Sequence, residues 1–127
     1  MERKSILVVD DEVDVVRVLK KQLMASGYEV LVAYDGLQAV EEVKKCPDLI
    51  LLDITMNGMD GIEVLRRVRD AVETKEIPVI MVTAKGASSS ILDAQNLGAT
   101  DYIIKPFEFK ELLPLIKKYI IQNGVRS

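Results

Sequence analysis

Five short apolar runs alternate along the chain with segments whose apolar residues recur at helical spacing. The runs are rich in Val, Ile and Leu and cover residues 5–9, 29–33, 48–52, 78–82 and 101–104. Because they are almost continuously apolar, they predict strands that are buried on both faces. The other segments predict amphipathic helices, with apolar stripes at Val16, Leu19 and Leu23, at Ala39, Val40 and Val43, at Ile62, Leu65 and Val68, and at Leu112, Ile116, Tyr119 and Ile120.

Strands that alternate with helices predict an α/β fold, in which helices cover both faces of a parallel sheet. Right-handed crossovers leave few topologies for such a sheet. We expect a flavodoxin-like, doubly wound (βα)5 three-layer sandwich whose five strands follow the order 2-1-3-4-5. The length of 127 residues predicts one domain, residues 1–127 with a core of about 5–121, and no output domain.

Polar residues stand where four of the predicted strands end. Asp10 and Asp11 follow the first run, Asp53 the third, Thr83 the fourth and Lys105 the fifth. In a doubly wound sheet, ligands bind beyond the carboxyl ends of the strands, near the switch in strand order. Because three carboxylates at one edge repel each other, the pattern predicts a bound cation.

Composition narrows the chemistry of this edge. The chain contains no histidine, which excludes Ser-His-Asp nucleophiles and histidine-ligated zinc sites. The remaining oxygen ligands favour Mg²⁺, for which Mn²⁺ is an acceptable substitute. The single Cys46, which precedes Pro47, is interpreted as a small, partly buried apolar residue rather than a reactive thiol.

Charge and hydropathy argue against two classes of partner. The 17 basic and 20 acidic residues are mixed along the chain, so we expect no direct nucleic-acid binding. The apolar runs are only as long as strands, and Met1-Glu2-Arg3-Lys4 leads into the first of them without a signal peptide. These features predict a cytoplasmic protein without membrane attachment.

A carboxylate nucleophile beside Mg²⁺ suits phosphoryl transfer, in which a lysine and a hydroxyl neutralise or bind the transferring oxygens. We therefore assign Asp53 as nucleophile, Thr83 as phosphoryl partner and Lys105 as counter-charge. Taken singly, Asp11 is an ordinary helix N-cap, Thr83 a β-branched strand end and Lys105 a solvated charge. Their occurrence together at four strand ends favours a shared site.

The surrounding segments resemble the receiver domain of two-component response regulators, from about Ser5 to Ile121. The similar motifs are Val8-Val9-Asp10-Asp11-Glu12, Leu51-Leu52-Asp53 with Met56 and Gly58-Met59-Asp60-Gly61, Thr83-Ala84, and Lys105-Pro106-Phe107. The resemblance implies that Asp53 accepts a phosphoryl group from a sensor histidine kinase or phosphotransfer protein. It further implies self-phosphorylation and autodephosphorylation, but no other enzymatic activity.

The same resemblance assigns further roles. Mg²⁺ would be held by Asp11, Asp53 and the backbone carbonyl of Thr55, with Asp10 acting mainly through water. The Lys105–Pro106 peptide bond would be cis, which costs little before proline. Thr55, together with Lys85, would occupy the positions that tune the lifetime of the phosphoryl group.

A conformational switch is implied as well. Thr83 would move toward the phosphoryl group and Tyr102 would turn inward, although Tyr102 alone is equally a half-buried edge-strand aromatic. The surface of the fourth helix, fifth strand and fifth helix would then contact a downstream protein. We expect a monomer or a weak, phosphorylation-linked dimer.

Two positions depart from the expected pattern, and the sequence fits two other functions less well. Asn57 stands where the family often has proline, and Pro114 predicts a kink or a late start of the last helix. A haloacid-dehalogenase-like phosphatase would carry a second acid where Thr55 stands, and Asp10-Asp11-Glu12 would repel the phosphate of a flavodoxin-like cofactor. A stand-alone regulator and a receiver from a longer regulator remain alternatives.

Overall fold

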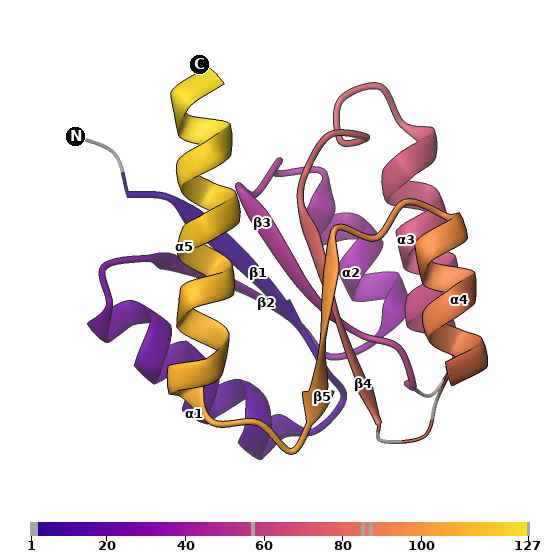
Figure 1. Cartoon of the computed structure of the whole chain (residues 1–127), viewed down its shortest axis with the longest axis horizontal. Coiled ribbons are helices and arrows are strands. Elements are labelled where there is room, and N and C mark those ends of the chain that lie inside the picture. The colour runs from indigo at the N-terminus through magenta and orange to yellow at the C-terminus, as the bar shows by residue number, and fades with distance from the viewer. Residues whose placement is uncertain (1–2, 57, 85, 87, 127) are drawn as a thin grey trace.

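The computed structural model describes residues 3–56, 58–84, 86 and 88–126. Strands and helices alternate along the whole chain (Figure 1). The elements are β1 (Ser5–Val9), α1 (Val13–Ala25), β2 (Glu29–Ala33), α2 (Gly36–Val43), β3 (Leu49–Asp53), α3 (Gly61–Asp70), β4 (Val79–Ala84), α4 (Ser88–Asn96), β5 (Asp101–Lys105) and α5 (Phe109–Arg126).

The five strands form one parallel sheet in the order β2-β1-β3-β4-β5, which confirms the predicted flavodoxin-like topology. Helices α1 and α5 cover one face, and α2, α3 and α4 cover the other (Figure 1). In this order the switch lies between the neighbouring strands β1 and β3. The acidic residues stand at the carboxyl ends of these same two strands.

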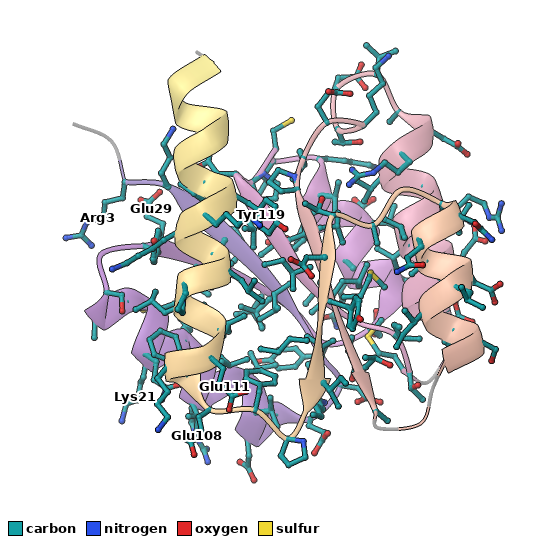
Figure 2. The ribbon with its side chains drawn as sticks, in the orientation of Figure 1. Arg3, Lys21, Glu29, Glu108, Glu111 and Tyr119 are labelled. Atoms are coloured by element: carbon teal, nitrogen blue, oxygen red, sulfur yellow. The ribbon has the colours of Figure 1, made fainter. Side chains whose placement is uncertain are left out.

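Alternate residues of each buried strand pack into two separate clusters. On β1, Ile6 faces α1 and α5 while Leu7 faces the other three helices. Helix α5 is held on its face of the sheet by Leu112 and Ile116, which are completely buried. Burying such a side chain stabilises a fold by roughly 1.5–3 kcal/mol. The sheet therefore rests between two packed layers, while charged side chains such as Lys21 and Glu108 point outward (Figure 2).

Three strands end later than predicted. Strand β3 includes Asp53, β4 continues to Ala84 and β5 includes Lys105. Asp53 pairs with Val82, and Thr83 pairs with Ile104, so both belong to the hydrogen-bonded ladder rather than to loops. The side chains with predicted chemical roles therefore project from backbone that neighbouring strands hold in place.

Two local features differ from the sequence-based expectations. Helix α5 begins at Phe109 and contains Pro114, so of the two predicted outcomes, a kink or a late start, the late start is wrong and the kink stays a prediction. The buried residues Leu112 and Ile116 hold it on the sheet on both sides of the proline. Cys46 is exposed rather than partly buried, because the backbone turns there with a positive φ of 54° and leads the chain away from α2. Among the described residues, no helix has the length and apolarity needed to cross a bilayer.

Candidate functional site

Three carboxylates meet at the carboxyl ends of β1 and β3. Oxygens of Asp10, Asp11 and Asp53 all lie within 4.8 Å of one another. Asp10 and Asp53 are 3% and 6% exposed, whereas Asp11 is more accessible to solvent. Since every donor in this set is a carboxylate oxygen, the chemistry suits a hard divalent cation such as Mg²⁺.

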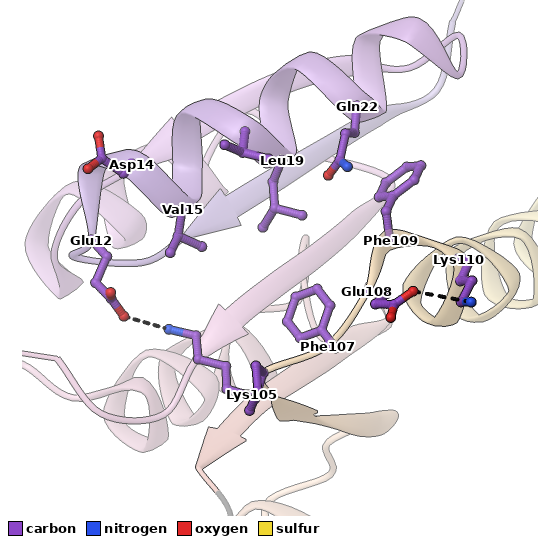
Figure 3. Close-up of a pocket in the computed structure, with 12 residues that line it drawn as sticks. Glu12, Asp14, Val15, Leu19, Gln22, Lys105, Phe107, Glu108, Phe109 and Lys110 are labelled. Atoms are coloured by element: carbon purple, nitrogen blue, oxygen red, sulfur yellow. Dashed lines mark hydrogen bonds and ion pairs between the residues drawn. The ribbon is translucent and has the colours of Figure 1, made fainter.

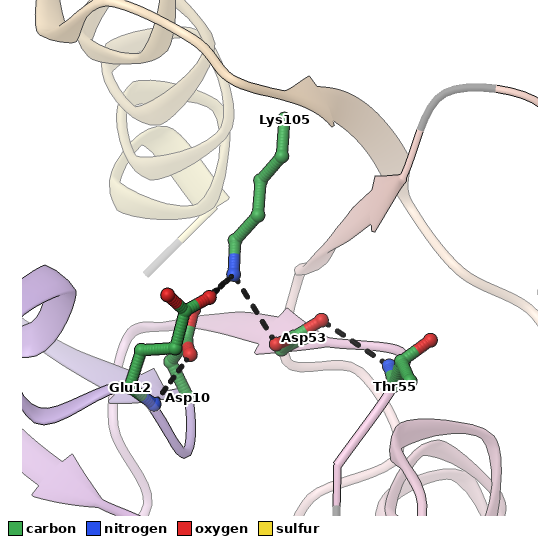
Figure 4. A network of polar contacts seen from close by, with 5 residues as sticks. All are labelled: Asp10, Glu12, Asp53, Thr55 and Lys105. Carbon is green, nitrogen blue, oxygen red and sulfur yellow. Dashed lines mark hydrogen bonds and ion pairs between the residues drawn. The ribbon is translucent and has the colours of Figure 1, made fainter.

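Lys105, at the end of β5, brings a positive charge to this cluster (Figure 4). Its Nζ lies 2.8 Å from Asp10 Oδ2, 3.1 Å from Glu12 Oε1 and 3.3 Å from Asp53 Oδ2. Burial alone lowers the pKa of Lys105, but the hydrogen bonds to Asp10 and Glu12 and the negative charge of Asp53 raise it above its usual value. The amine is therefore a permanent cation within reach of the Asp53 carboxylate.

Backbone groups orient the two buried acids. Asp10 Oδ1 accepts a hydrogen bond from the Glu12 N–H at 2.9 Å, and Asp53 Oδ1 accepts one from the Thr55 N–H at 3.2 Å. A Cβ at Gly61, the first residue of α3, would collide with the Asp53 carbonyl oxygen and come within 2.8 Å of Ile54 Cα. Glycine at this position lets α3 begin directly against the strand that carries Asp53.

The electrostatic balance at Asp53 leaves its carboxyl group harder to ionise than usual. Burial and the nearby charge of Asp10 raise the pKa of Asp53 from 3.8 to about 6, while Lys105 and the Thr55 N–H oppose the rise. A bound cation would favour the ionised form. The Asp53 carboxyl group would therefore ionise most readily together with a bound metal.

The remaining predicted site residues lie on β4, on β5, at the Lys105–Pro106 bond or outside the described part of the chain. Thr83 is 1% exposed, and its hydroxyl donates to the Ala84 carbonyl oxygen at 3.3 Å. The Lys105–Pro106 peptide bond is cis. Tyr102 is 41% exposed on β5, and Lys85 lies outside the described residues.

Sequence reasoning assigned no contact to Glu12. The residue follows the acidic pair directly, and its carboxylate contacts Lys105 across 93 positions of sequence. The run of three acids Asp10-Asp11-Glu12 was the only available signal. An acid at this position is equally consistent with a solvated residue before α1, and 62% of the Glu12 side chain is indeed exposed.

A groove opens beside Lys105, between α1 and the segment that joins β5 to α5 (Figure 3). It measures about 940 Å³, and its apolar walls include Val15, Val18, Phe107 and Phe109. Glu12 and Lys105 belong both to this groove and to the acidic site. The acidic site is therefore continuous with a mainly apolar groove.

Comparison with known proteins identifies the family. Residues 6–117 match the family described as the response regulator receiver domain. The chain belongs to this family. A curated relative, the uncharacterized transcriptional regulatory protein YkoG of Bacillus subtilis, is 37% identical over 128 residues, which cover all of this chain and 55% of the relative. The receiver domain thus spans about half the length of that relative.

Solved structures agree with this assignment. A protein described as a response regulator from Chloroflexus aurantiacus has a TM-score of 0.88 and 36% identity, with 94% of this chain and 99% of that chain covered. The receiver domain of a sensor histidine kinase from Pseudomonas aeruginosa, which has magnesium in its active-site cleft, has a TM-score of 0.85 and 29% identity, with 94% and 98% covered. The match is thus to receiver domains of two-component signalling, not to haloacid-dehalogenase-like phosphatases.

Proposed function

We propose that this receiver domain accepts a phosphoryl group on Asp53 from a phosphohistidine of a partner protein. The observation that carries the proposal is the convergence of Asp10, Asp11, Asp53 and Lys105 at one sheet edge, with the amine 3.3 Å from the Asp53 carboxylate. A carboxylate flanked by a metal site and a fixed cation is the arrangement that phosphoryl transfer requires.

Asp53 supplies the nucleophile in this proposal. A carboxylate oxygen attacks phosphorus, the phosphorus–nitrogen bond of the phosphohistidine breaks, and the departing imidazole takes the electron pair of that bond and is protonated by solvent. Lys105 neutralises negative charge on the phosphoryl oxygens, and the Thr83 hydroxyl, near the end of β4, binds a phosphoryl oxygen. Fixed donors of this kind stabilise charge without reorganising at the moment of reaction.

We infer that Asp11, Asp53 and the Thr55 carbonyl oxygen hold Mg²⁺, with Asp10 acting mainly through water. The oxygen-only donor set supports this assignment, and Mn²⁺ suits it as well. When bound, the ion neutralises the carboxylates and the transferring group. The magnesium in the active-site cleft of the related kinase receiver is consistent with this role.

Two surfaces support partner binding. The apolar groove that ends at Glu12 and Lys105 would receive the phosphohistidine-bearing partner, a sensor histidine kinase or phosphotransfer protein. On the other side of the site, Tyr102, Ile104 and Leu92 expose 41%, 44% and 59% of their surface on β5 and α4. We propose that this second surface contacts a downstream protein once Thr83 and Tyr102 have changed position.

The test is intact-mass analysis after incubation with Mg²⁺ and acetyl phosphate. The wild-type protein should gain one phosphoryl group, and chelation of Mg²⁺ should prevent the gain. Asp53→Asn should gain none, whereas Asp14→Asn, which removes an exposed carboxylate that pairs only with Arg17 among the described contacts, should react like wild type.

Three results would contradict the proposal. The wild-type protein could stay unmodified while another receiver domain reacts under the same conditions. This result would show that the protein is not a phosphoacceptor. A phosphoryl group on the Asp53→Asn variant would show that another residue is the acceptor. Steady turnover of phosphomonoesters would instead indicate a phosphatase.

A further inference from the structure

Arg69, near the C-terminal end of α3, donates hydrogen bonds to segments that are far apart in sequence. Its Nε binds the Gly98 carbonyl oxygen at 2.9 Å. Its Nη1 binds the carbonyl oxygens of Ile77 at 2.7 Å and Lys75 at 3.1 Å, and its Nη2 reaches Thr100 Oγ1 at 3.4 Å. One guanidinium therefore joins α3, the segment before β4 and the segment before β5.

Gly98 lies two residues beyond Asn96, the last residue of α4. The Gly98 N–H donates to the Gln95 carbonyl oxygen at 3.1 Å, and the Ala99 N–H donates to the Ala94 carbonyl oxygen at 2.9 Å. Gly98 has a φ of +92°, so this is the glycine-terminated end typical of helices. Because the end is closed in this way, holding the Gly98 carbonyl also holds the last turn of α4.

Thr100 extends the same connection into the sheet. Its hydroxyl oxygen accepts a hydrogen bond from the Val79 N–H at 2.9 Å, and its own N–H donates to the Val79 carbonyl oxygen at 2.9 Å. Arg69 thus binds to a segment that is locked onto the first residue of β4. The planar guanidinium suits this role because its donors are fixed in one plane and charge-assisted bonds are stronger than neutral ones.

The rest of α4 is held less firmly. Ala94 is the only buried side chain among the described α4 residues. A cavity of about 190 Å³ lies beside the helix, and its lining includes Ile91, Ala94 and Gln95 of α4, Met81 of β4 and Thr100 before β5. Since cavities permit movement, the packing beneath α4 leaves the helix room to shift, and the bonds from Arg69 to Gly98 and Thr100 oppose such a shift at its C-terminal end.

We propose that Arg69 is a positioning residue that anchors the C-terminal end of α4, so that α4 moves about Gly98 when the site beyond β4 changes. The anchor itself is independent of phosphorylation, and only the movement rests on the proposed function. Arg69 contacts none of the site residues, so it acts solely through the placement of α4 and the start of β5.

Amide hydrogen exchange measured by NMR on the whole chain tests the anchor. In the unliganded protein, Arg69→Met should raise exchange at residues 95–100 by about tenfold relative to the core amides of β1, because the two charge-assisted bonds to Gly98 and Thr100 in that segment are lost. Arg67→Met is the matched control, since Arg67 lies on the same helix, is 53% exposed and pairs with Glu63. Arg69→Lys, which keeps the charge, should give a smaller rise and replaces the Met variant if that variant does not fold.

Addition of Mg²⁺ and beryllium fluoride, a phosphoryl mimic, tests the movement. In wild type, this addition should change the protection of amides from exchange at residues 89–92 and leave it constant at residues 95–100. In Arg69→Met, the protection of both groups of amides should change. Equal exchange at 95–100 in the Arg69 and Arg67 variants would overturn the anchor, and a wild-type response at 95–100 as large as at 89–92 would overturn the movement. If wild type shows no response anywhere, the proposed function fails, and the unliganded exchange still decides whether Arg69 is an anchor.

Discussion

Replacing Asp53 by Asn should stabilise the metal-free protein above pH 6. The reason is that burial and the charge of Asp10 raise the pKa of Asp53 from 3.8 to about 6. A carboxyl group with a higher pKa in the folded state stabilises the fold while it is protonated. This contribution is complete below pH 3.8 and is lost as the pH rises through about 6. Asn keeps a neutral side chain at every pH and avoids the loss.

The size of the effect follows from the difference between the two pKa values. A rise from 3.8 to about 6 is about 2 units, and each unit corresponds to about 1.36 kcal/mol, so the limit is about 3 kcal/mol. Water reaches the site through the accessible Asp11 side and screens part of this energy. We therefore expect the variant to gain about 1–2 kcal/mol at pH 8, or roughly 5 °C in Tm.

The assay is urea denaturation of both proteins at pH 5 and pH 8 in the presence of a chelator. The difference in unfolding free energy should be about half as large at pH 5, which lies between the pKa of 3.8 in the unfolded chain and the pKa of about 6 in the folded protein, and it should be full at pH 8. Addition of Mg²⁺ at pH 8 should stabilise wild type more than Asp53→Asn, because the ion binds only the folded site and loses a carboxylate ligand in the variant.

The reasoning would be refuted by an Asp53→Asn protein that is less stable than wild type at pH 8, or by a difference that does not depend on pH. The first result would mean that the Lys105 contact at 3.3 Å outweighs burial and the repulsion from Asp10. Asp14→Asn provides the matched control, because its side chain is 84% exposed and the change should stay within about 0.5 kcal/mol at both pH values.

Three further changes test other parts of the structure. Gly61→Ala should destabilise the protein by about 1–3 kcal/mol in thermal or urea denaturation, because its Cβ would collide with the Asp53 carbonyl; an unchanged stability would show that α3 can retreat freely. Lys105→Met should tighten Mg²⁺ binding about three- to tenfold in calorimetric titration, because an amine 2.8 Å from Asp10 competes with the ion; weaker binding would mean that the amine instead organises the carboxylates. Asp101→Asn should lower the pKa of Tyr119 (Figure 2). In the wild-type protein, the 2.6 Å hydrogen bond from the Tyr119 hydroxyl to Asp101, burial and the charge of Asp101 raise this pKa to about 12. Absorbance at alkaline pH measures the shift, and an unchanged titration would show that Asp101 is not its cause.

The sequence predicted the fold well because the signals for it are local. The apolar runs and helical stripes identified all five strands, and the strand order was confirmed. Local signals did less well at single residues. Nothing near Cys46 indicated that the backbone takes a positive φ there, and Pro114 suggested a helix start that the burial of Leu112 and Ile116 overrides. Tertiary packing outweighed local preference at Pro114.

The site shows the same division. Residue types at the strand ends indicated that Asp10, Asp11, Asp53 and Lys105 share one edge, since parallel strands end together. Glu12 was missed because an exposed acid before a helix has no pattern that distinguishes it. Arg69 was missed because its acceptors lie as far as 31 positions away and are mostly backbone carbonyls, which carry no residue signature.

By itself, the sequence determined the order of elements, the chemistry available at the strand ends and the absence of histidine from that chemistry. Only the tertiary structure decided which carboxylates share Lys105, how deeply Asp53 is buried and therefore in which direction its pKa moves. It also decided that Arg69 holds the end of α4. Periodicity is a property of neighbours along the chain, whereas desolvation and charge interactions depend on groups that folding brings together from distant positions.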